Sequence, residues 1–133
     1  MSRLQINQSD LLPENQDKRC DEIYKQCRYI PYYLLKFDAI KNEEEFDNIN
    51  RICSFVEKYC EKIGQDYKIK TTAIEHFNTF IIPYIKEKIN DIVIKIEFEK
   101  HNTRFELQVF IYRKNETPNT SEMIMSTNFY ISQ

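Results

Sequence analysis

The chain has 133 residues, of which 41% are hydrophobic and 30% charged, and its formal net charge at pH 7 is −2. This composition predicts a single globular domain spanning residues 1–133, and the near-balanced charge argues against nucleic acid or an anionic membrane as the main partner. Gly64 is the only glycine, which excludes the glycine-rich phosphate loops of common nucleotide-dependent enzymes, and we expect no cofactor.

The N-terminal segment, residues 1–16, lacks the apolar run of a signal peptide. No stretch of the chain approaches the roughly 20 apolar residues of a membrane-spanning helix. We therefore expect a soluble, cytoplasmic protein without a membrane partner. Residues 1–13 are expected to form an irregular lead-in, residues 14–90 a helical part, and residues 91–133 a set of antiparallel strands.

The first predicted helix runs from Glu14 to Tyr29. The apolar residues of this region recur every three or four positions, at Cys20, Ile23, Cys27, Ile30, Leu34 and Phe37. Pro31 lacks a backbone N–H and biases the residue before it away from helical geometry, so a break is expected there. Because the apolar rhythm continues beyond the proline, residues 32–40 are expected to form a second helical piece.

Residues 46–63 show the clearest periodicity of the chain and predict a second main helix. Its apolar seam is formed by Phe46, Ile49, Cys53, Val56, Cys60 and Ile63, with a spacing typical of helix–helix packing. Asn42 is a suitable N-cap and Gly64 a suitable C-terminal stop. Residues 71–90 carry a wider apolar stripe and predict a third, more buried helix that bends at Pro83.

The four cysteines form two pairs with the same spacing of seven residues. If the first two main helices pack antiparallel, Cys20 lies level with Cys60 and Cys27 with Cys53, so two disulfides would be geometrically feasible. The alternative is four free, buried thiols that act as small hydrophobic side chains, which suits a chain without a secretion signal. A shared metal ion is excluded, because ligands about 10 Å apart along one helix cannot converge on it.

The C-terminal part switches to a period of two, which is typical of half-buried strands. Two runs of alternating apolar residues are formed by Ile92, Ile94, Ile96 and Phe98, and by Phe105, Leu107, Val109 and Ile111. A turn centred on His101 and Asn102 would join them as a hairpin and place Phe98 opposite Phe105. Residues 123–131 predict a third strand. The expected fold is α+β, with three to four helices on one face of a three-stranded antiparallel sheet.

The sheet face opposite the apolar rows is the candidate binding surface. Its aromatic and charged members are Glu97, Glu99, Arg104, Glu106, Phe110, Tyr112 and Tyr130. In the register above, Glu97 and Glu106 would face each other. Aromatic side chains exposed beside charges are typical of surfaces that meet another protein, although another element of the chain could also cover them.

No coherent catalytic constellation is found. Neither His76 nor His101 has a nucleophile or a second histidine at a meaningful spacing. We therefore favour a non-catalytic protein-binding module, such as a small inhibitor, immunity protein or adaptor, whose partner is another protein. One alternative is a small enzyme or ligand binder with an acidic site around Glu97, Glu106 and His101. The other is RNA or DNA binding on the aromatic sheet face.

Overall fold

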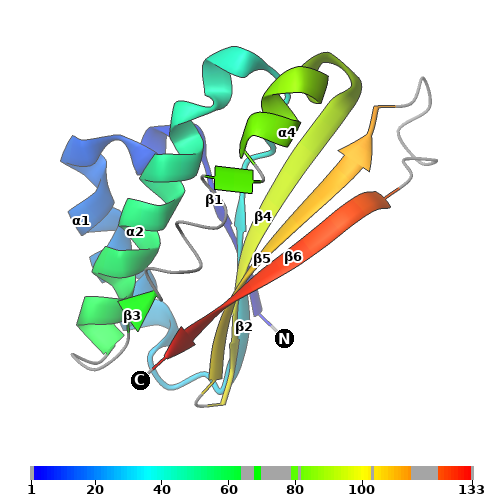
Figure 1. Ribbon diagram of the computed structural model, residues 1–133. Coiled ribbons are helices and arrows are strands. Elements are labelled where there is room, and N and C mark those ends of the chain that lie inside the picture. The colour runs from blue at the N-terminus through cyan, green and yellow to red at the C-terminus, as the bar shows by residue number, and fades with distance from the viewer. Residues whose placement is uncertain are drawn as a thin grey trace.

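The computed structural model describes residues 2–63, 68–69, 79–80, 82–102, 104–114 and 123–132 and shows an α+β fold (Figure 1). The described strands are β1 (Ser2–Ile6), β2 (Tyr32–Phe37), β3 (Lys68–Ile69), β4 (Ile92–His101), β5 (Arg104–Arg113) and β6 (Met123–Ser132). They form one sheet in the order β1-β2-β4-β5-β6-β3. Because β1 runs parallel to β2 while the other neighbours are antiparallel, the sheet is mixed.

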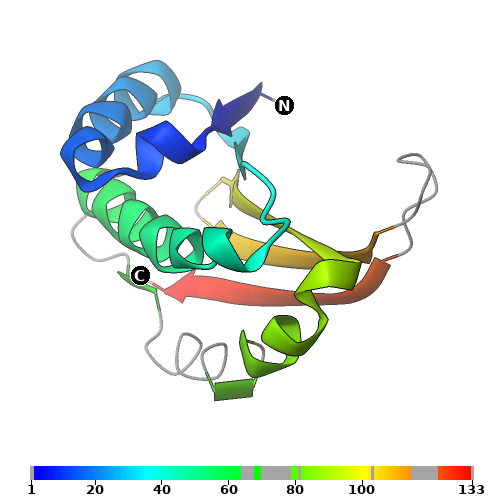
Figure 2. The ribbon, with the colours of Figure 1, turned by 90° about the horizontal axis from the view of Figure 1, so that it is seen from above.

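The described α-helices are α1 (Pro13–Cys27), α2 (Asp47–Ile63) and α4 (Ile82–Lys88), with short 3-10 turns η1 (Gln8–Leu11), η2 (Glu43–Glu45) and η4 (Ile89–Asp91). Helices α1 and α2 lie over one face of the sheet (Figures 1 and 2). Ile85 of α4 is fully buried in the same core. No helix among the described residues is both long and apolar enough to cross a bilayer.

Two segments that were expected to be irregular or helical are strands. Residues 2–6 form β1 rather than a lead-in, and residues 32–37 form β2 rather than a helical piece. Tyr33, Leu35 and Phe37 are two residues apart along β2 and all three are buried, a spacing that fits a strand. The spacing of three or four residues that predicted a helix fits the same segment equally well, so the two patterns compete. Backbone pairing on both sides, with β1 and β4, selects the strand.

Helices α1 and α2 run in the same direction, so the predicted antiparallel pairing is wrong. Asp17 forms an ion pair with Lys58 (3.8 Å), and Asp21, one turn further on, forms one with Lys62 (2.6 Å). Residue numbers thus increase together along the two helices. The reason is that β2 lies between them in the chain and returns it to the end from which α1 started.

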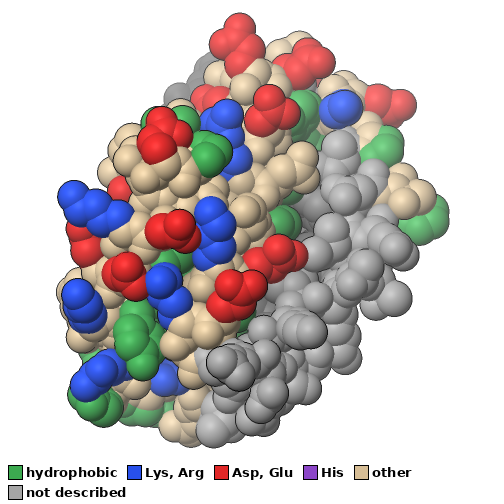
Figure 3. All heavy atoms as spheres, turned by 90° about the vertical axis from the view of Figure 1, so that its left-hand side faces the viewer, with side chains coloured by type: hydrophobic (Ala, Val, Ile, Leu, Met, Phe, Trp, Pro, Cys, Tyr) green, Lys and Arg blue, Asp and Glu red, His purple; other side chains and the backbone are tan. Residues whose placement is uncertain are grey.

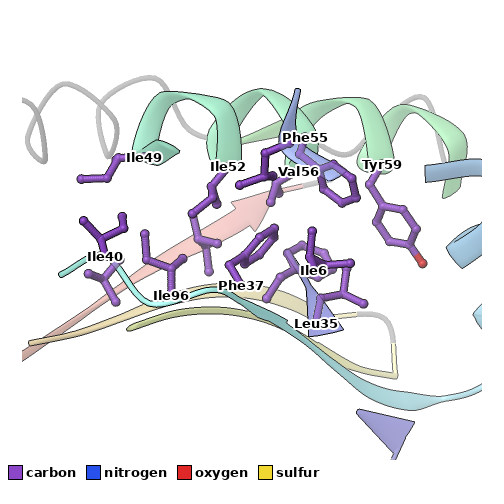
Figure 4. Packing of buried hydrophobic residues seen from close by; sticks show 14 of the residues in the cluster. Ile6, Leu35, Phe37, Ile40, Ile49, Ile52, Phe55, Val56, Tyr59 and Ile96 are labelled. Atoms are coloured by element: carbon purple, nitrogen blue, oxygen red, sulfur yellow. The ribbon is translucent and has the colours of Figure 1, made fainter. Parts of the chain in front are cut away.

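The buried face of α2 is wider than its predicted seam. Its fully buried apolar side chains include Ile52, Phe55 and Tyr59, whereas Cys53 and Ile63 of the predicted seam are partly exposed. Figure 4 shows Ile52, Phe55 and Val56 directed toward residues of the sheet layer, among them Phe37 and Ile96. Since α2 packs against the sheet as well as against α1, burial is centred on the side of the helix that faces both.

The β4–β5 hairpin is present, but its register differs from the prediction by two residues. Phe98 pairs with Leu107 and Ile96 with Val109, while His101 pairs with Arg104. Asn102 enters the turn with φ at 59°, a left-handed conformation that asparagine tolerates better than most residues. An even shift keeps every side chain on its predicted face, so the apolar rows still point at the helices.

The remaining predictions of the helical and strand parts have different outcomes. Helix α1 is confirmed within two residues at each end, and β6 matches the predicted third strand. Helix α4 lies inside the predicted third helix, but residues 71–78, with His76, lie outside the described residues, as does Gly64. The predicted three-stranded antiparallel sheet is the β4-β5-β6 part of the mixed sheet, which β1, β2 and β3 extend.

Candidate functional site

The candidate surface is the face of the sheet that points away from α1 and α2, here called the outer face. Strand register places all seven predicted binding residues on it, because residues two apart share a face. Across the strands, Glu99 is opposite Glu106, and Glu106 is in turn opposite Tyr130. The observed register therefore brings together the set that the sequence predicted.

In the acidic part of the outer face, the cross-strand partner of Glu106 differs from the prediction. Glu106 faces Glu99, while Glu97 faces Gln108, so the predicted Glu97–Glu106 pair is wrong and these two carboxylates are diagonal neighbours. Gln108 donates a hydrogen bond from Nε2 to Oε2 of Glu99 (3.0 Å). Oε1 of Glu97 lies 3.9 Å from Nζ of Lys36 on β2, which is a long ion pair. Two like charges directly opposite each other are unfavourable in an isolated sheet.

The aromatic part of the outer face lies further along the same hairpin. The ring centroids of Phe110 and Tyr112 are 6.5 Å apart, and Nζ of Lys95 lies 5.1 Å from the centroid of the Tyr112 ring. Both aromatic side chains are half-buried and no described helix covers this face. The outer face thus combines carboxylates near the turn with an aromatic pair towards the other end of β5.

Strands β1 and β2 add residues that the sequence analysis did not place on this surface. A pocket of about 190 Å³ is lined by Gln5, Lys36, Asp38, Lys95 and Glu97, among others. Within it, Nε2 of Gln5 donates to Oδ1 of Asp38 (2.8 Å). The signal that could have found β1 is the alternation of polar with apolar residues over positions 3–6.

The described contacts do not join Glu97, Glu106 and His101, the residues of the acid–base alternative, in one site. The ring of His101 packs edge-to-face on Tyr32, with centroids 4.5 Å apart, and no described hydrogen bond or ion pair joins it to Glu97 or Glu106. Glu106 is not among the residues that line the pocket beside Glu97. Among the described residues, no group of three or more His, Cys, Asp or Glu side chains could hold a metal ion.

All four cysteines are free thiols. Cys20, Cys27 and Cys60 are fully buried, and Cys53 is partly exposed. Burial raises the pKa of Cys20 and of Cys60 to about 12, and that of Cys53 to about 11. Because the thiolate is the nucleophilic form, these raised pKa values disfavour reaction of the thiols at neutral pH. The parallel direction of α1 and α2 removes the predicted level pairing of Cys27 with Cys53. Cys20 stays near the level of Cys60, because the ion pairs of Asp17 with Lys58 and of Asp21 with Lys62 lie on either side of them.

The helix layer offers no comparable surface. The exposed side of α1 and α2 carries acidic and basic side chains interspersed with one another (Figure 3). Several of these charges are already paired within the chain, as Asp17 is with Lys58 and Asp21 with Lys62.

Comparison with known proteins assigns no family: no protein-family model, no curated protein and no solved structure matched this chain.

Proposed function

We propose that this protein is a non-catalytic protein-binding module that uses the outer face of its sheet. The partner is a protein with a basic surface patch, and binding neither requires a cofactor nor makes or breaks a covalent bond. The observation that carries this proposal is the Glu99–Glu106 pair, set directly opposite across two neighbouring strands.

The charge argument follows from the cost of that pair. Two carboxylates in a direct cross-strand pair destabilise the hairpin, by up to roughly 1 kcal/mol relative to a neutral pair. Gln108 donates to Glu99, but no described cation forms an ion pair with either carboxylate. A lysine or arginine of a partner placed between the two carboxylates would be attracted by both. Because it would remove the repulsion present in the free protein, that repulsion adds to the free energy of binding.

The aromatic pair supplies the apolar part of the interface. Phe110 and Tyr112 lie on the strand that carries Glu106, four and six residues further along. Large aromatic side chains on a rigid strand lose little conformational freedom on binding and are enriched among the residues that dominate interface energies. An acidic half and an aromatic half on one rigid sheet therefore match a basic partner surface with an apolar centre.

The test compares what the protein captures from its source cells with and without the outer face. The variants Glu106→Lys and Tyr112→Ala change the two halves of the surface separately, and Glu44→Lys, an exposed position between β2 and α2, is the matched control for the charge reversal. We expect one protein to be retained in stoichiometric amount by the wild type and by E44K, and to be lost with E106K and Y112A.

A protein retained equally by all four chains would show that the outer face is not the interface. Retention of nucleic acid by the wild type, released as salt is raised, would instead favour the sheet as a nucleic-acid surface. Circular dichroism of each variant excludes loss of fold as the cause.

A further inference from the structure

A second concave surface lies at the opposite side of the fold from the aromatic pair, where α1 and α2 end beside the β4–β5 turn. It is a pocket of about 310 Å³, at the lower end of the range for small-molecule sites. Its lining combines two cations, Arg28 and Lys100, with aromatic side chains that include Tyr24 and Tyr29. No carboxylate is among the lining residues that the structure describes.

The two cations are held in place by neutral groups, because neither has a carboxylate partner among the described residues. The Arg28 guanidinium lies over the rings of Tyr29 (4.5 Å to the centroid) and Tyr24 (6.0 Å), and it donates to the Tyr29 hydroxyl. Nζ of Lys100 donates to the backbone oxygen of Ile30 (3.2 Å) and lies 5.5 Å from the centroid of the Tyr33 ring.

These contacts leave most of the donors unused. A guanidinium has five N–H groups and an ammonium three, and the described hydrogen bonds use one of each. A favourable position near the C-terminus of α1 accounts for part of the role of these cations, but not for the donors that no described hydrogen bond uses. Two positive charges that have no carboxylate partner in the described part of the chain lie in one concave site and attract an anion, and the planar guanidinium fork is well suited to a phosphate or carboxylate.

The aromatic walls define the rest of the ligand. Tyr24 and the largely exposed Tyr29 offer ring surfaces beside the cations, and the buried Phe105 and the exposed Asn102 also line the pocket. Asn102 is fixed there, since its backbone N–H donates to the oxygen of Pro31 (2.8 Å) and its Nδ2 donates to the Tyr32 hydroxyl (2.9 Å). We propose that this pocket binds a small molecule in which one anionic group is attached to an aromatic ring.

Phenyl phosphate is the probe for this proposal, with inorganic phosphate and phenol as its two separate halves. Each is titrated into the full chain labelled with ¹⁵N, and amide shifts are followed by NMR. We expect saturable shifts centred on residues 28–30 and 100–102 with phenyl phosphate, and at least about ten-fold weaker binding of either half alone. Equal affinity for inorganic phosphate would overturn the assignment of an aromatic ligand.

Variants decide whether the two cations form the site. Arg28→Gln and Lys100→Gln should each weaken phenyl phosphate binding about ten-fold, the typical effect of losing one charge-assisted hydrogen bond. Lys18→Gln removes an equal charge from an exposed position on α1 and should leave the affinity unchanged. Arg28→Lys keeps the charge but loses the planar fork, and an intermediate affinity is expected.

The proposal is overturned if R28Q and K18Q bind the probe equally well, or if shifts are spread over surface lysines without saturation. Thermal unfolding of each variant separates a local effect from loss of fold. Because the outer face is not part of this pocket, its variants E106K and Y112A should bind phenyl phosphate like the wild type, so the two proposals fail independently.

Discussion

A buried pair of tyrosines offers the sharpest test of how this core is held together. Tyr33 of β2 and Tyr59 of α2 are both fully buried, and their hydroxyl groups are hydrogen-bonded to each other. Their rings meet edge-to-face with centroids 6.3 Å apart. No buried side-chain oxygen or nitrogen among the described residues lacks a hydrogen-bond partner, and this one contact gives each of the two hydroxyl oxygens its described partner.

Replacing one tyrosine by phenylalanine removes one hydroxyl and leaves the other buried without a partner. Tyr33→Phe or Tyr59→Phe should therefore lower the free energy of unfolding by about 1–3 kcal/mol. The double variant removes both polar groups and leaves an apolar contact of nearly the same shape, so it should cost less than the sum of the two single changes. We expect a coupling energy of about 1–2 kcal/mol between the two positions.

Equilibrium unfolding in urea, followed by circular dichroism, measures all four chains of this cycle. Tyr24→Phe is the control, because the Tyr24 hydroxyl makes no described hydrogen bond and its loss should change stability by less than about 0.5 kcal/mol. Additive costs in the double variant would refute the reasoning, since they would mean that each hydroxyl is satisfied independently of the other.

Three further outcomes follow from other contacts. Unfolded thiols ionise near their ordinary pKa of 9.0, whereas burial raises the pKa of Cys20 and Cys60 to about 12. The contribution of each of these thiols to the free energy of unfolding should therefore be constant below pH 9 and fall by about 1.4 kcal/mol per pH unit above it, and Tyr33 and Tyr59, whose pKa is also raised by burial, should add to the fall at higher pH, as measured by urea unfolding at stepped pH. Asn102→Ala should destabilise the fold by about 1–2 kcal/mol in the same assay, because alanine resists the positive φ. Glu106→Gln should raise stability by about 0.5 kcal/mol by removing the repulsion with Glu99, and a loss of stability would contradict that cause.

The elements that could be predicted from the sequence are those whose periodicity has one interpretation. Helix α2 spans 17 residues with a consistent apolar stripe, and β4 and β5 alternate over ten residues each. In such stretches many residues favour the same structure, so one ambiguous position changes nothing. The third strand followed from the same signal, and β6 lies where it was expected.

Strand β2 shows why other elements could not be predicted. Leu34 and Phe37 continue the spacing of α1 beyond Pro31, while Tyr33, Leu35 and Phe37 also satisfy a period of two. A six-residue segment contains too few positions to separate the two periods, and its pairing with residues far away in the chain decides between them. The error propagated, since a strand between the helices makes them parallel where two consecutive helices would be antiparallel.

The register of the hairpin depended on turn chemistry rather than on apolar matching. The predicted register sets every apolar residue of the two rows opposite another, whereas the observed one places Ile92 opposite Arg113 and Phe105 opposite Lys100, so apolar matching alone favours the wrong register. The observed turn lies one residue further along, where Asn102 adopts a positive φ and bonds to Pro31 and Tyr32 of the neighbouring strand region. Tyr32 opens β2, where a helical piece was expected, and Pro31 is the expected break just before it.

The residues of the candidate surface nevertheless share one face of the sheet, because the face on which a strand residue lies depends only on whether its position is odd or even. A register error of two residues preserves this parity, and adding β1 and β2 extends the sheet sideways without turning it over. What the error changed is the partner of Glu106. In the observed register Glu97 has Lys36 as a neighbour, while the described side chains give Glu99 the neutral Gln108 and no cation, so among them the uncompensated repulsion is between Glu99 and Glu106. A basic partner should therefore be anchored at this pair, and Glu97→Gln should weaken its binding less than Glu99→Gln does.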